Sequence, residues 1–250
     1  MEIAEQILFI TSMLGIVAMS ASGALVAIDC QLDIIGVIVL SVVTTVGGGV
    51  MRDVLLGKLP PSLFRESIYT VYLLVATAVA VLLFVIAYFY QSFVIKNRNI
   101  LLQITNAFDA VGLGAFTIVG AKTAIISDYG SNLFFVVFIG VITGAGGGIL
   151  RDIMAGQVPV VLRKRIYIVA SIAGALLYSC MQYARLADGL ASCVSMGVIV
   201  VIRMLATYFR WNLPKVVLKD DCGCDSGIVS QEKEEQAETK LTGKHSETAV

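Results

Sequence analysis

The chain contains the stretch GGGVMRDVLLGKLP at residues 47–60, and a second version, GGGILRDIMAGQVP, follows at residues 146–159. The two share the pattern GGGxxRDxxxGxxP at an offset of 99 residues. A weaker match precedes it at an offset of 97, where Gly15, Ala18, Gly23 and Ala24 correspond to Gly112, Ala115, Gly120 and Ala121. Such self-similarity indicates that the chain consists largely of a duplicated unit.

Both copies of the motif lie inside long apolar runs. A membrane-spanning helix needs about 20 mostly apolar residues, and seven runs qualify: about 6–28, 34–56, 68–90, 100–121, 132–154, 166–184 and 190–209. The composition agrees, because 58% of the residues are hydrophobic and 14% are charged, against about 45–50% and about 25% in soluble domains. The sequence therefore predicts an all-α integral membrane protein with seven spans.

The repeat sets the topology of these spans. Repeat one covers residues 1–90, repeat two covers residues 100–184, and the run at 190–209 has no counterpart. Three is an odd number of spans, so the second copy must begin on the opposite side of the membrane from the first. The repeats are therefore inverted, an architecture typical of transport proteins whose working site lies near the midplane. We assign residues 1–209 to one transmembrane domain.

The distribution of Lys and Arg in the short loops predicts the orientation. With the N-terminus outside, the cytoplasmic segments carry eight of these residues: Lys96, Arg98, Arg163, Lys164, Arg165, Arg210, Lys215 and Lys219. The external segments carry four: Lys58, Arg65, Lys122 and Arg185. The C-terminus is then cytoplasmic, and the polar, acidic stretch at 212–250 is expected to be a disordered tail.

Several classes of function find no support in the composition. The formal net charge is zero, so the chain lacks the basic footprint of a nucleic-acid-binding protein. The five Cys form no regular framework, and we expect no metal site at the lone His245 in the polar tail. We assign no catalytic residues and no cofactor, and we expect a protein that is not an enzyme.

The glycine triplets are the first candidate site: Gly47, Gly48, Gly49, Gly146, Gly147 and Gly148. Each glycine lowers helix propensity by about 1 kcal/mol relative to Ala, so we expect the second and fifth helices to be broken there. The freed carbonyls near Gly47 and Gly146 would bind K⁺ or Na⁺ transiently, and the triplets would line the ion path. The alternative is close helix packing of the small-xxx-small kind, a spacing that Gly140, Gly144 and Gly148 also fit.

Charged residues follow each triplet: Arg52, Asp53, Arg151 and Asp152. A charge at the centre of a spanning helix costs about 2.5–3.5 kcal/mol on insertion scales, so these four must face one another or water near the path. We expect Arg52 to compensate Asp152 and Arg151 to compensate Asp53 across the repeats. An ionic lock with a purely structural role is the alternative.

Asp109 is a further ionisable residue inside the fourth span. The corresponding position of repeat one is Ser12. An acid without a counterpart in a spanning helix is a candidate for the ion pathway; the alternative is an acid hydrogen-bonded to a neighbouring helix. Arg203, near the cytoplasmic end of the seventh run, is expected to extend toward the interface.

Two GGGxxRDxxxGxxP motifs in a three-plus-three-plus-one layout resemble the bacterial branch of the trimeric intracellular cation (TRIC) channels, a family also labelled glycine-transporter-like. The resemblance covers residues 5–209. It implies a homotrimer in membrane lipid, a pore through each protomer, second and fifth helices bent at the glycines, and permeation by K⁺ and Na⁺. It also implies the inner membrane of a bacterium.

Three hypotheses of function follow. The first is a passive channel for monovalent cations. The second is a secondary transporter of a small solute such as glycine, because inverted repeats and broken helices serve both. The third is a structural membrane protein in which the charges only lock the fold.

Overall fold

A computed structural model of the chain describes residues 3–91, 96–163 and 166–209, so the predicted tail at 212–250 lies outside the described residues. In these ranges all regular structure is helical. Seven helices are long and apolar enough to cross a membrane, which confirms the predicted fold class. They are α1 (Ile3–Asp29), α2 (Ile34–Leu55), α4 (Ile68–Phe89), α6 (Arg98–Ala124), α7 (Leu133–Met154), α9 (Ile166–Tyr183) and α10 (Asp188–Tyr208). The short helices α3 (Ser62–Arg65) and α8 (Val160–Arg163) follow α2 and α7, and a π-helical turn, η1 (Ile125–Tyr129), extends α6.

The helices α2 and α7 begin and end in the same way. The Asp33 side chain accepts a hydrogen bond from the backbone N–H three residues later at 2.7 Å, and Asn132 does the same at 3.1 Å. These N-caps satisfy donors that the first helical turn leaves without partners. At the other end, Gly57 and Gly156 adopt φ values of +69° and +68°. The fourth glycine of the motif is therefore the left-handed residue that terminates each helix.

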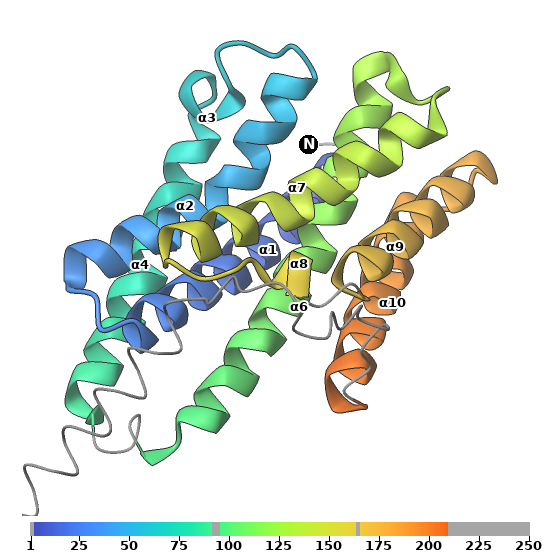
Figure 1. The fold of residues 1–250 in the computed structure, drawn as a ribbon. Helices are drawn as coiled ribbons and strands as arrows, with labels where there is room; N and C mark the ends of the chain where they lie inside the picture. The colour runs from blue at the N-terminus through green and yellow to red at the C-terminus, as the bar shows by residue number, and fades with distance from the viewer. Residues whose placement is uncertain (1–2, 92–95, 164–165, 210–250) are drawn as a thin grey trace, which may run out of the picture. The chain divides into compact units, whose positions relative to one another are not determined.

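Corresponding helices of the two repeats pack against each other in opposite directions. In the α1–α6 contact, Gly15 packs on Phe116 while Gly112 packs on Met19, so the order of contacts is reversed along the two helices. The same reversal holds between α2 and α7, as predicted for inverted repeats. α10 has no counterpart, and it packs on α9 and α6 (Figure 1).

The prediction that the second and fifth helices are broken at the glycines needs correction. Both α2 and α7 are continuous α-helices through their triplets, and α2 changes direction partway along its length (Figure 1). The physical reason is that a backbone among apolar groups must satisfy its own hydrogen bonds. The glycines are used for close approach between the two helices rather than for unwinding either one.

Candidate functional site

The glycine triplets lie where α2 crosses α7. A Cβ atom at Gly48 would overlap the backbone carbonyl of Thr143, and a Cβ at Gly147 would overlap the carbonyl of Thr44. A Cβ at Gly146 would lie 3.2 Å from the Cα of Gly48. The two backbones are thus in direct contact, which residues with larger side chains would prevent. Close packing accounts for these glycines, and their role in an ion path stays a prediction.

The third glycine of each triplet has different surroundings. Apart from its chain neighbours and the backbone of its own helix, no atom lies within 4 Å of the position that a Cβ would take at Gly49. The same position at Gly148 is 3.2 Å from the hydroxyl of Tyr167 and 3.6 Å from a carboxylate oxygen of Asp109. Gly49 therefore borders empty space, whereas Gly148 borders a cluster of polar groups.

Repeat one contains a buried arginine–aspartate pair. The Nε of Arg52 donates to Oδ1 of Asp53 at 2.8 Å, and its Nη2 donates to the hydroxyl of Tyr69 at 3.3 Å. The other carboxylate oxygen of Asp53 accepts from the backbone N–H of Ser62 at 2.8 Å. Arg52 is 5% exposed and Asp53 is 1% exposed. Asp53 thus both neutralises the arginine and anchors the start of α3.

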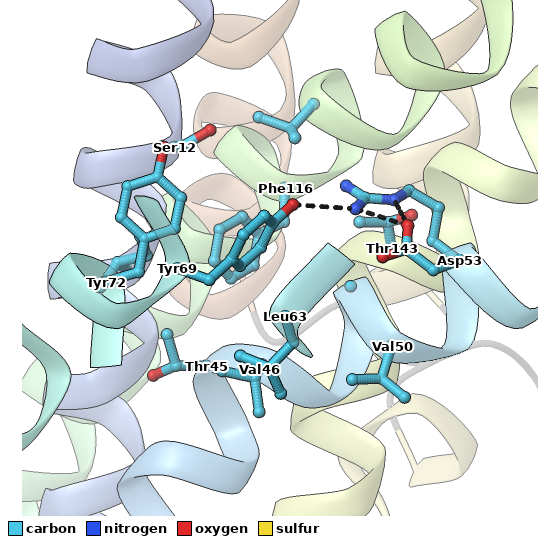
Figure 2. Close-up of a pocket in the computed structure, with 14 residues that line it drawn as sticks. Ser12, Thr45, Val46, Val50, Asp53, Leu63, Tyr69, Tyr72, Phe116 and Thr143 are labelled. Atoms are coloured by element: carbon cyan, nitrogen blue, oxygen red, sulfur yellow. Dashed lines mark hydrogen bonds and ion pairs between the residues drawn. The ribbon is translucent and has the colours of Figure 1, made fainter. Parts of the chain in front are cut away.

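A cavity lies beside this pair (Figure 2). Its volume of about 60 Å³ admits a few water molecules, since one needs about 10–15 Å³ on this measure. Gly49 and Arg52 contribute to its wall, together with the rings of Tyr69, Tyr72 and Phe116. Three hydroxyl-bearing residues also line it, Ser12, Thr45 and Thr143, and apolar groups make up most of its wall, including the side chains of Ile16 and Val119. Tyr69 and Tyr72 meet edge to face with ring centroids 5.3 Å apart.

Repeat two contains a larger cluster at the equivalent place. Arg151 donates through Nε to Asp152 at 2.9 Å, and through Nη1 to Asp109 at 2.9 Å and to Ser22 at 2.6 Å. Arg203 of α10 donates to the second oxygen of Asp109 at 2.7 Å. All four charged residues are 3–4% exposed. The carboxylate of Asp109 therefore bridges two arginines from different helices.

The two repeats differ because Asp109 stands where repeat one has Ser12. The acid draws the guanidinium of Arg151 toward α6, and Arg203 supplies the second positive charge, so two arginines balance two aspartates. The Arg203 guanidinium also lies 4.2 Å from the ring centroid of Tyr167, a cation–π contact. The cluster fills in repeat two the region that is a cavity in repeat one.

The expected pairing across the repeats was wrong. Arg52 pairs with Asp53 at 2.7 Å, and Arg151 pairs with Asp152 at 2.8 Å, each within its own repeat. The reason is that each aspartate is held by the following short helix, through the N–H of Ser62 or Val160. The arginine folds back onto this fixed carboxylate, and the α2–α7 crossing brings glycines, not charges, into closest approach.

The carboxylate of Asp109 contacts Arg151 and Arg203, as expected for an acid bonded to neighbouring helices, and its role in the ion pathway stays a prediction. Arg203 does not extend to the interface as expected; it is 4% exposed and pairs inside the protein. The balance of charges in the sequence could have predicted that Arg203 pairs inside the protein. Arg151 already has Asp152 as its acid, so a second aspartate buried in the same repeat requires another base.

Lys122 belongs to a separate polar cluster where α6, α9 and α10 meet. Its ammonium forms an ion pair with Asp188 at the start of α10. The same carboxylate accepts from the Tyr178 hydroxyl at 2.8 Å and from the Gln182 amide at 2.7 Å. This cluster ties α10 to both neighbouring helices.

Transient cation binding at the carbonyls near Gly47 and Gly146 stays a prediction. Because α2 and α7 are continuous, these carbonyls lie within helices, and cation binding there would require local opening. Within the described parts of the chain, His, Cys, Asp and Glu side chains form no cluster of three or more that could hold a metal ion.

Comparison with known proteins detects the duplication within this chain and finds relatives that share its sequence and fold. A family model described as "Glycine transporter" matches residues 9–88 and again residues 106–183. The membrane protein YvgT of Bacillus subtilis is 36% identical over 203 residues, which cover 81% of this chain and 93% of that protein. The inner membrane protein YadS of Escherichia coli is 32% identical over 199 residues, covering 80% and 90% respectively.

Solved structures share the same architecture. A prokaryotic TRIC channel crystallised in 0.5 M KCl superposes with a TM-score of 0.73 at 31% identity, covering 84% of this chain and all of the other. The trimeric intracellular cation channel orthologue from Rhodobacter sphaeroides gives a TM-score of 0.71 at 31% identity, covering 82% and 98%.

Proposed function

We propose that this chain, a member of the bacterial branch of the trimeric intracellular cation (TRIC) channel family, is a cation channel. It would conduct K⁺ and Na⁺ along a path inside each protomer. The solved relatives are cation channels rather than enzymes. The observation that carries the proposal is the cavity beside the α2–α7 crossing, at the third glycine of the first triplet (Figure 2).

The cavity is mainly apolar, and the few polar groups in its wall suit monovalent cations. Its polar atoms are largely hydroxyl oxygens, from residues such as Ser12, Thr45 and Tyr69, and oxygen dipoles can replace part of an ion's hydration shell. The charge of Arg52 is compensated at 2.7 Å by Asp53, so the pair adds little net repulsion against a cation. Gly49 keeps the space open, and a side chain there would enter it.

The same geometry favours a channel over a glycine transporter. A glycine zwitterion needs a partner for its carboxylate and a partner for its ammonium group. In the cavity, the Arg52 guanidinium is engaged by Asp53 and Tyr69, and both oxygens of Asp53 are already accepting hydrogen bonds. Asp53 is the one acid among the residues that line the cavity, and because it is only 1% exposed it offers the ammonium group of glycine little access.

The assembly and location follow as parts of the proposal. We propose a homotrimer, each protomer with its own path, supported by the trimeric name of the Rhodobacter orthologue. We place it in the inner membrane of a bacterium, as YadS is named, with the N-terminus outside and the C-terminus in the cytoplasm. The outward apolar surface of the spanning helices would contact lipid.

The test is electrical recording from purified, reconstituted protein. Gly49→Leu should lower K⁺ conductance strongly, because the new side chain enters the cavity from a position where its Cβ meets no neighbouring side chain. Gly197→Leu is the matched control, since a Cβ there also meets no atom within 4 Å but lies on α10, away from the cavity. The wild type should show a cation-selective reversal potential in a KCl gradient.

Two results would overturn the proposal. One is saturable glycine counterflow without unitary currents in the wild type. The other is a Gly49→Leu variant that conducts like Gly197→Leu, which would remove the cavity from the ion path.

A further inference from the structure

A groove with two connected parts lies between α1, α4 and α6 at one edge of the membrane. Its outer part, of about 550 Å³, is lined by polar and charged side chains that include Asp29, Gln31, Tyr88 and Arg98. Its inner part, of about 410 Å³, is lined by apolar side chains that include Leu25, Leu83 and Ile86. The two parts share Ile28, Ala87 and Leu101, so they form one continuous groove.

The depth of the groove can be read from the ends of the spans. The α1 span ends at Asp29, the α4 span ends at Phe89, and the α6 span begins at Arg98, so the outer part lies at the membrane–water interface. In Figure 1 the end of α4 and the beginning of α6 lie near each other at the lower left. On α1 the inner part reaches Leu25, about one helical turn deeper than Asp29, whereas on α4 it lies beside the outer part, between Leu83 and Tyr90.

The outer part presents two opposite charges side by side. Arg98 donates through Nε to one oxygen of Asp29 at 2.6 Å, and through Nη2 to the other at 2.9 Å. A guanidinium has five N–H donors, so three remain after these two bonds. The Arg98 side chain is 67% exposed and the Asp29 side chain is 14% exposed. The pair therefore offers outward donors and a partly accessible carboxylate, with no net charge.

We propose that this groove binds phosphatidylethanolamine. Its phosphate would bind the outward N–H groups of Arg98, an interaction that guanidinium groups favour. Its ammonium group would lie against Asp29, and one acyl chain would occupy the apolar inner part. A pair without net charge matches a zwitterionic headgroup better than an anionic one. Phosphatidylcholine is a poorer fit because its quaternary ammonium has no N–H to donate to Asp29.

The test is native mass spectrometry of the purified full chain with three lipids of identical acyl chains: phosphatidylethanolamine, phosphatidylglycerol and phosphatidylcholine. The wild type should retain phosphatidylethanolamine best. Arg98→Gln should weaken the binding of phosphatidylethanolamine about tenfold. This corresponds to about 1.4 kcal/mol, because one charge-assisted contact to the phosphate is lost. Arg65→Gln is the matched control, because Arg65 is also an exposed arginine beside an acid, Glu66, outside this groove.

A second variant tests the charge argument itself. Asp29→Asn leaves Arg98 uncompensated, so the preference should move from phosphatidylethanolamine to phosphatidylglycerol. A third, Leu83→Trp, fills the inner part and should lower retention of all three lipids while the charges stay in place. Equal retention of the three lipids by the wild type, equal effects of Arg98→Gln and Arg65→Gln, or an unchanged preference in Asp29→Asn would each contradict the proposal.

Discussion

Replacing Asp109 by Asn perturbs the most highly charged part of the interior. The wild-type cluster balances two arginines against two aspartates, all 3–4% exposed. In the variant, Arg151 keeps Asp152, but Arg203 loses the carboxylate that it contacts at 2.7 Å. Leaving a buried charge without its partner costs about 3–5 kcal/mol. We therefore expect Asp109→Asn to lower the free energy of unfolding by about that amount.

The double variant Asp109→Asn with Arg203→Met isolates the electrostatic part of this cost. It removes one charge of each sign, so the cluster is neutral again, and Met can fill part of the space that Arg203 leaves. We expect a total loss of about 1–2 kcal/mol, well below the loss for Asp109→Asn alone.

Chemical unfolding of the detergent-solubilised protein, followed by its helical circular dichroism, measures both variants. Glu66→Gln is the control, because it breaks an exposed ion pair worth less than about 1 kcal/mol. A loss below about 1 kcal/mol for Asp109→Asn would refute the reasoning, as would a double variant less stable than the single one.

Three further predictions test other parts of the structure. Gly48→Ala should destabilise the protein by about 1–3 kcal/mol through overpacking at the α2–α7 crossing, whereas Gly49→Ala should change stability little; equal losses would contradict the packing role of Gly48. Asp188→Asn should lower the free energy of unfolding by about 2 kcal/mol, because Lys122, the Tyr178 hydroxyl and the Gln182 amide lose a charged acceptor. A thermal unfolding midpoint equal to that of the wild type would argue against this. Reporter fusions at Val250 should be active as cytoplasmic fusions, and activity of a periplasmic reporter there would reverse the orientation.

The fold was largely predictable because the bilayer imposes strong rules on sequence. A span must be long and apolar, so helices such as α1 and α10 are recognisable from their apolar runs. The duplicated motif identified two copies, and because each copy has an odd number of spans, the second copy must be inverted relative to the first. The last glycine of each motif, Gly57 or Gly156, also has a local explanation, because a helix that ends in a left-handed residue favours glycine at that position.

For the candidate site, the sequence predicted which charged residues take part but not how they pair. Arg52, Asp53, Arg151, Asp152 and Asp109 were recognised because charges are rare in spanning helices. Their partners depend on which helix faces which, and no local pattern encodes that. The expected pairs crossed the repeats, whereas the short helices after each motif hold the aspartates next to their own arginines.

The sequence alone determined that this protein spans a membrane seven times as inverted repeats, since span length, hydrophobicity and duplication are properties of the chain in order. Only the tertiary structure decided that Gly48 serves contact, that Gly49 borders a cavity, and that Arg203 neutralises Asp109. These outcomes depend on distances between residues that lie far apart in the sequence. A buried charge can be satisfied by any helix that comes within reach, so its partner is fixed by packing and not by sequence position.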